Sequence, residues 1–348
     1  MTRTREIYQS FGGSLLAGFL LLMAACSDSQ EPLADAASGG NLRLAAVTRT
    51  DGSTPLEEEG SQVRLFIASQ DALLSSAGGT FIFSGGSWSS TASVKENSQY
   101  YLYGYLANTA GITVTASEPA GGDFSAGADL TFTGLPAITA DDICVIVGVE
   151  QVDSKGAPWN VTEGSYGYLS KTDDQNYVNL LLDHLYSQLK LQFRVGDSYA
   201  GLREIHLKEV KLTATYAAGS ATVSLRSGSG IGTPVYTIPT GNTEYDVLAA
   251  SASEVILTTD AASAVLGTFC CIPDVFSSDG STLKLTSTYD VYDRKGNKIA
   301  ERTADNKLAV TGMARGKSRT LTLTVEPTYL YILSDDDLDN PSIIVSSE

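Results

Sequence analysis

The chain has 348 residues, of which 23 are Lys or Arg and 40 are Asp or Glu, and its formal net charge is −17. Such acidity argues against nucleic-acid binding, because affinity for phosphate backbones comes mainly from clustered Lys and Arg. Since His184 and His206 are the only histidines, a multi-histidine metal centre is disfavoured, and we expect neither a metal site nor a cofactor.

Residues 1–25 are predicted to be a lipoprotein signal peptide. Arg3 and Arg5 precede an apolar run over residues 15–25, which is too short to span a bilayer and stops at Cys26. Residues 23–26 (MAAC) resemble the bacterial lipobox, in which the signal is cut before the cysteine and lipid is attached to that residue. Cys26 is therefore the predicted lipidation site, and more than one acyl chain on it would hold the protein stably at a membrane.

Residues 26–41 have the polar, small and Gly-containing composition of a flexible tether. The folded body is expected to begin at residue 42, where residues 42–47 (LRLAAV) have strand character. Arg49 and Thr50 follow in a polar stretch, so a trypsin-like protease could cut between them. The alternative is a solvated arginine without such a role, because exposed arginines are common.

Most of the body shows the period-two alternation of half-buried strands, as in residues 189–195 and 321–325. A change of apolar parity near Glu209 predicts a β-bulge. Gly-Gly and Asp-Gly clusters mark the turns, and no sustained amphipathic helix is visible. The pattern predicts an all-β fold with two β-sandwich domains, at residues 42–172 and 173–348.

The cysteines of the body do not form a disulfide pattern. Cys144, Cys270 and Cys271 are an odd set that lies in apolar strand sequences, and no metal-binding C-x-x-C spacing occurs. We expect them to be buried as small hydrophobic residues.

Several motifs together resemble one family. Residues 81–88 (FIFSGGSW) and 99–106 (QYYLYGYL) resemble a Gly-Gly-Trp and Tyr-rich passage of the fimbrillin family, the subunits of type V pili in Bacteroidetes. Residues 183–193 are similar to the histidine-led strand that opens that family's second domain, and residues 316–325 to its glycine-led strand near the C-terminus.

The resemblance implies two tandem transthyretin-like β-sandwich domains behind a lipoprotein signal peptide and a flexible tether. It also implies a surface-exposed, lipid-anchored protein of the cell outer membrane and of a fimbrium. Polymerising subunits of the family are trimmed after an arginine, which removes a first strand and opens a groove for a strand of another subunit. Arg49 and Thr50 match this position, and residues 42–47 would be the strand removed. The candidate donor segments are residues 329–333, 335–339 and 343–345.

Two other kinds of site are disfavoured. Residues 335–339 place Asp335, Asp337 and Asp339 at alternate positions, as in a calcium loop, but the positions that should be Gly and Glu are Asn340 and Ser346. A solvated acidic loop is therefore preferred. Catalytic residues are not expected, because the chain has no G-x-S-x-G turn and its two histidines are predicted to lie in strands without partners for chemistry.

The stripe of tyrosines from Tyr100 to Tyr105 is expected to pack within the sheet, although exposed rings there, with Trp88 or Trp159, could stack on sugars. The predicted function is a structural subunit of a surface pilus that serves adhesion, with other pilus subunits as partners and an unknown surface ligand. The alternative is a surface glycan-binding lipoprotein of a polysaccharide-uptake system. An enzyme is not expected.

Overall fold

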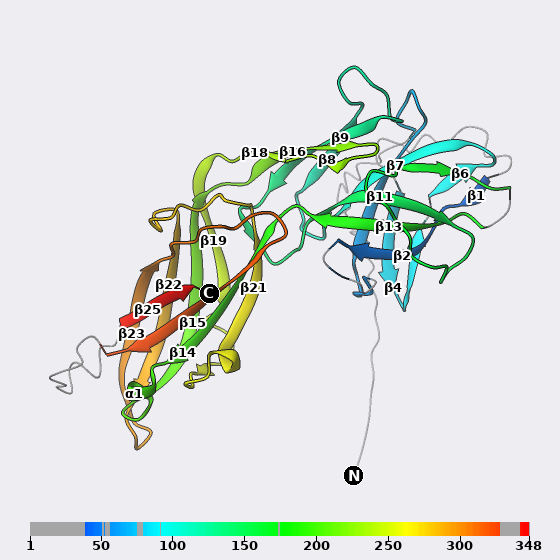
Figure 1. The fold of residues 1–348 in the computed structure, drawn as a ribbon. Coiled ribbons are helices and arrows are strands. Elements are labelled where there is room, and N and C mark those ends of the chain that lie inside the picture. Colours follow the sequence, from blue (N-terminus) through cyan, green and yellow to red (C-terminus); the bar gives the residue numbers. More distant parts are fainter. Residues whose placement is uncertain are drawn as a thin grey trace, which may run out of the picture. The chain divides into compact units, whose positions relative to one another are not determined.

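The computed structural model describes residues 39–50, 52, 56–74, 79–90, 92–172, 175–327 and 342–347. These residues form β-strands almost throughout, with one short helix, α1 (Asp197–Ala200), and one 3-10 turn, η1 (Ala261–Ala264) (Figure 1). The predicted all-β class is therefore confirmed. None of the described helices is long and apolar enough to span a membrane. The predicted signal peptide and Cys26 lie outside the described residues, and so does most of the tether.

The largest sheet has eight strands in the order β2-β13-β11-β7-β3-β4-β5, with β12 paired to β7. All of its pairs are antiparallel except β2 with β13, which are parallel. The sheet curls so that its two edge strands, β2 and β5, lie beside each other. Its strands are β2 (Arg43–Arg49), β3 (Gln62–Ala68), β4 (Gly79–Ser84), β5 (Ser87–Ser90), β7 (Gln99–Leu106), β11 (Cys144–Val152), β12 (Gly167–Leu169) and β13 (Tyr177–His184).

Both faces of the central strands of this sheet are buried, because their apolar residues alternate between two cores. On β7, Tyr103 and Tyr105 pack into a core shared with a second sheet, whereas Leu102 and Leu106 point into the core enclosed by the curl. The second sheet has the order β17-β16-β9-β8, with β18 paired to β16. Its strands are β8 (Thr113–Ser117), β9 (Gly127–Leu135), β16 (Gly219–Arg226), β17 (Gly230–Ile231) and β18 (Val235–Thr237). A small pair, β1 (Gly39–Asn41) with β6 (Ser93–Lys95), lies at the start of the described chain.

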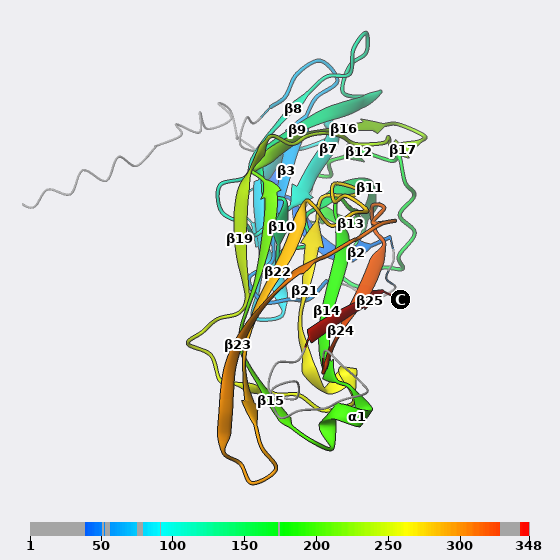
Figure 2. The same ribbon diagram turned by 90° about the vertical axis from the view of Figure 1, so that its left-hand side faces the viewer.

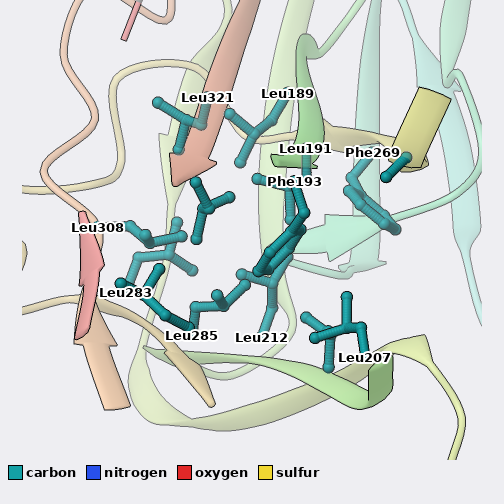
Figure 3. Close-up of a cluster of buried hydrophobic side chains, with 14 of the residues drawn as sticks. Leu189, Leu191, Phe193, Leu207, Leu212, Phe269, Leu283, Leu285, Leu308 and Leu321 are labelled. Atoms are coloured by element: carbon teal, nitrogen blue, oxygen red, sulfur yellow. The ribbon is translucent and has the colours of Figure 1, made fainter. Parts of the chain in front are cut away.

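Two further sheets form another sandwich. One has the order β10-β21-β14-β24-β25, and the other β19-β15-β22-β23 with β20 on β15. Leu189, Leu191 and Phe193 of the first sheet meet Leu212 and Leu285 of the second in a buried core (Figure 3). Figure 2 shows β25 beside β24 at the sheet edge. The strands are β10 (Ile138–Thr139), β14 (Ser187–Val195), β15 (Glu204–Tyr216), β19 (Thr240–Leu248), β20 (Val255–Ile256), β21 (Val265–Cys271), β22 (Leu283–Tyr292), β23 (Lys298–Lys307), β24 (Ser318–Glu326) and β25 (Ser342–Ser347).

The β-bulge predicted near Glu209 is present, because the pairing register between β15 and β22 shifts between Leu207 and Glu209. The domain boundary at 172 and 173 stays a prediction. Strands on either side of it do share sheets, since β13 pairs with β11 and β16 pairs with β9. Alternation along a strand reports which face is buried but carries no information about which neighbour it pairs with.

Candidate functional site

Strand β2 is an edge strand whose apolar side chains enter the curled core. Leu42, Leu44 and Val47 are only 1%, 4% and 0% exposed. Leu44 aligns with Val178 of β13, and Val47 with Leu180, while the register shift between these pairs leaves one extra residue in β2. That irregularity explains how residues three positions apart both face the core, although strict alternation would place them on opposite faces.

The chain before and within β2 bridges two parts of the body. Residues 39–41 pair with β6, and the backbone N–H of Leu42 then donates to the carbonyl of Ala92 at 2.9 Å. The next residue, Arg43, donates its N–H to the carbonyl of Asn176 at 2.8 Å and begins the pairing with β13. Residues 39–49 therefore close the curled sheet on this side.

The Arg49–Thr50 bond, the predicted processing site, lies where β2 ends and is held on both sides. Arg49 Nε lies 2.8 Å from Asp142 Oδ2, and the Arg49 side chain is 26% exposed. Thr50 donates its N–H to the carbonyl of Leu182 at 2.8 Å and its hydroxyl to Asp183 Oδ1 at 2.9 Å. A protease needs an extended and unpaired segment, so the end of β2 must separate from β13 before this bond can be cut.

Asp142 joins Arg49 to His184 and Cys144. Its Oδ1 lies 2.8 Å from His184 Nδ1, and Cys144 Sγ lies 3.8 Å from the same nitrogen. Burial raises the pKa of Asp142, but the hydrogen bond with His184 and the charges of His184 and Arg49 outweigh burial, so its pKa is lowered. Burial, followed by the nearby Asp142 charge, raises the pKa of the Cys144 thiol.

These contacts correct the expectation that the histidines lack partners. Asp142, Cys144 and His184 offer oxygen, sulfur and nitrogen atoms within 4.8 Å of one another, a donor set that suits zinc. Asp142 is also paired with Arg49, so the described group is part of an ion-pair cluster. His206 also has partners, since its ring nitrogens lie 2.5 Å from Glu204 and 3.0 Å from Glu254.

The cluster extends into the C-terminal half through Asp183 and Arg315. Arg315 pairs with Asp183 and also donates to the carbonyl of His184 at 3.0 Å. Asp183 therefore contacts both Thr50, at the end of β2, and Arg315, just before β24. Sequence analysis missed Asp142 and Asp183 as partners of the processing site, because no local pattern brings residues so far apart in sequence together.

One of the candidate donor segments, residues 343–345, is paired with another strand of the same chain. Residues 343–345 belong to β25, which pairs antiparallel with β24 at the edge of its sheet. Ile343 is buried at 7% exposure, whereas Ile344 is 51% exposed. The other donor segments, 329–333 and 335–339, lie outside the described residues, as do the aspartates considered for calcium.

The tyrosine stripe packs inside the protein, as expected. Tyr100, Tyr103 and Tyr105 are at most 6% exposed, whereas Tyr101 is partly buried and packs against the same core as Tyr103 and Tyr105. Tyr103 donates its hydroxyl to the carbonyl of Phe124. Burial raises the pKa of Tyr103. Cys144, Cys270 and Cys271 are likewise buried and free of disulfides.

No protein-family model matches the sequence, and no curated protein matches it. Several solved structures resemble the fold. A fimbrial protein from Bacteroides vulgatus is 10% identical, with a TM-score of 0.43, and the match covers 89% of this chain and 99% of that one. A Bacteroides ovatus protein whose name assigns it to cell adhesion is 11% identical, with a TM-score of 0.41 and coverage of 88% and 95%. The fimbrial anchor protein Mfa2 from Porphyromonas gingivalis is 11% identical, with a TM-score of 0.31 and coverage of 88% and 96%. These three proteins are named as fimbrial or cell adhesion proteins.

Proposed function

We propose that this chain is a structural subunit of a cell-surface pilus or fimbria. It is exported as a lipoprotein anchored at Cys26 in the outer membrane, trimmed after Arg49, and polymerised by strand exchange to serve adhesion. The observation that carries the proposal is the position of β2, an edge strand that fills the curled core and has Arg49 as its last residue.

Removal of residues up to Arg49 would leave an opening with a defined shape. Leu42, Leu44 and Val47 would vacate buried positions, each worth about 1.5–3 kcal/mol of apolar burial. The backbone groups of β13 that pair with β2 would also lose their partners. An incoming strand of suitable alternation would restore both the burial and the hydrogen bonds, and strand addition of this kind is an established mode of recognition.

The donor in this proposal is the C-terminal segment of another subunit, including residues 342–347. In the described chain this segment pairs with β24 on one side only, because β25 is the last strand of its sheet. Leaving that edge costs one ladder of hydrogen bonds and the burial of Ile343. Pairing in the vacated groove of a neighbour replaces both.

The test is N-terminal sequencing of material taken from the cell surface. Trimming predicts Thr50 as the first residue, together with ladders on gels that resist sodium dodecyl sulfate. Two substitutions within β2 provide a matched pair, since Arg49→Gln should block trimming and Arg43→Gln should leave it intact. Surface protein that is monomeric and keeps residues 26–49 in the unaltered chain and in both variants would refute the proposal.

A surface glycan-binding lipoprotein is the second candidate function. One observation favours it, a tryptophan-lined pocket beside β2.

A further inference from the structure

A pocket of about 450 Å³ lies along strand β2. We call it the edge pocket. Residues 45–48 of β2 line it, and other walls come from the β4–β5 hairpin, strand β13 and the connection between β11 and β12. Its principal side chains are those of Val47, Thr48, Phe83, Trp88, Trp159 and Asn179.

Two walls of the edge pocket are indole rings. Trp88 and Trp159 are the only tryptophans of the 348-residue chain, and both are partly exposed. Trp88 packs edge-on against Phe83, with ring centroids 5.3 Å apart, so its ring is held in place. Aromatic faces provide large, rigid apolar surfaces without requiring the ligand to be wholly apolar.

The edge pocket also has a buried polar wall. Asn179 is 2% exposed, and its Nδ2 donates to Glu150 Oε2 at 2.9 Å, which fixes the orientation of the amide. The carbonyl oxygen is then the group of this side chain that can accept a ligand hydroxyl. Thr48 is a second buried polar residue and contributes a hydroxyl, and the exposed Glu57 and Lys155 also line the pocket.

We propose that the edge pocket binds a pyranose ring of a surface glycan. A pyranose has a C–H face that can stack on an indole and hydroxyls around its rim that can meet the amide, hydroxyl, carboxylate and ammonium groups of this pocket. A wholly apolar ligand would offer no hydrogen bond to the carbonyl oxygen of the Asn179 amide, whose Nδ2 is already held by Glu150. A predominantly apolar pocket with a few fixed polar groups is the usual form of a small-ligand site.

Binding in the edge pocket is coupled to the state of β2. Residues 45–48 form one wall, so the complete pocket exists only while β2 remains in the sheet. A ligand that binds only this state stabilises it by mass action. Sugar binding should therefore protect the Arg49–Thr50 bond. The binding itself is independent of the proposed pilus role, whereas the value of this protection to the cell rests on that role.

The first experiment is a tryptophan-fluorescence titration of the full chain. Because the only two tryptophans both line the pocket, any change of their emission reports on this site. The probes are the methyl pyranosides of mannose, galactose, glucose and N-acetylglucosamine. At least one should give a saturable change, with a Kd of about 0.1–1 mM. Trp159→Ala should weaken binding about tenfold by calorimetry, whereas Val235→Ala, which trims a side chain that is 67% exposed and outside the pocket, should leave it unchanged.

The second experiment measures trypsin cleavage at Arg49 with the sugar that binds. At a sugar concentration of about ten times Kd, cleavage should slow about tenfold, and Trp159→Ala, with its tenfold weaker binding, should reduce the protection at that concentration to about twofold. The proposed site is refuted if none of the four sugars binds at about 10 mM, or if Trp159→Ala binds as tightly as the unaltered chain. Binding of a peptide that copies residues 342–347, in place of sugars, would also refute it. Thr50 at the N-terminus of surface material, with no protection by a bound sugar, would overturn the coupling and leave the pilus role intact.

Discussion

Asp142 should control how readily the end of β2 opens. The substitution Asp142→Asn removes the carboxylate that lies 2.8 Å from Arg49 Nε and 2.8 Å from His184 Nδ1. It keeps the size of the side chain and one acceptor oxygen. The Arg49 and Asp142 side chains are only 26% and 24% exposed, so water replaces the lost contact poorly.

The magnitude follows from these contacts. An exposed ion pair contributes up to about 1 kcal/mol and breaking a buried one costs about 3–5 kcal/mol, so the partly exposed pair of Arg49 and Asp142 lies toward the lower of these limits. We expect Asp142→Asn to lower the free energy of local opening at the end of β2 by about 1–2 kcal/mol, which corresponds to a 5–30-fold larger open population. Limited trypsin digestion, followed by mass spectrometry of the Arg49–Thr50 cut, should show cleavage accelerated by that factor, because cleavage tracks the open population when closing is fast.

Asp129→Asn is the matched control. Asp129 pairs with Arg226 at 2.7 Å, and the two side chains are 23% and 35% exposed, but the pair lies between β9 and β16, away from β2. This variant should leave cleavage at Arg49 nearly unchanged. If the two variants accelerate cleavage equally, or if neither does, the contact between Asp142 and Arg49 does not restrain the end of β2 and the reasoning is wrong.

Three further outcomes are expected. Gly104→Ala should destabilise the chain by more than about 3 kcal/mol in a denaturant titration, because the added Cβ would lie 2.1 Å from the Arg64 carbonyl oxygen. The control, Gly201→Ala, should be tolerated, because the atom nearest to its added Cβ would be 3.8 Å away. Similar denaturation midpoints for the two variants would contradict this account. Burial lowers the pKa of His206, but its hydrogen bonds to Glu204 and Glu254 outweigh burial and raise it, so its stabilising effect is complete below the unfolded value of about 6.5 and is lost as pH rises through the folded pKa. The stability deficit of His206→Gln should thus be greatest near pH 5 and shrink toward pH 9 in thermal melts, and a deficit that grows with pH would refute the assignment. Burial raises the pKa of the thiols of Cys144, Cys270 and Cys271, to about 12 for Cys270. Iodoacetamide should therefore label these three cysteines only after unfolding. Rapid labelling of any of them in the native chain, detected by peptide mapping, would contradict their burial.

Much of the fold was accessible from the sequence because alternation is a local property. Residues 189–195 and 321–325 alternate as written and form β14 and β24, and the parity change near Glu209 marks a real bulge. The tyrosine stripe was correctly expected to pack, since aromatic residues on a strand bury large areas against cross-strand neighbours.

The partners of the candidate site were not accessible in the same way. Arg49 stands out as a basic residue in a polar stretch, but Asp142 and Asp183 become partners of Arg49 and Thr50 only because β13 pairs with β2 on one side and with the start of β11 on the other. The predicted lack of partners for His184 failed for the same reason, since its neighbours Asp142 and Cys144 come from before and within β11.

The sequence by itself determined that the chain is an acidic β-protein whose strands each have an apolar face, because composition and period-two alternation are written in consecutive residues. It also identified Arg49 as a candidate processing position, with a solvated arginine as the alternative. Only the tertiary structure decided that β2 is an edge strand closing a curled sheet and that Arg49 is held by Asp142. The same folding placed Trp88 and Trp159 around one pocket. Strand pairing depends on contacts between distant segments, and alternation along one strand does not specify its neighbour.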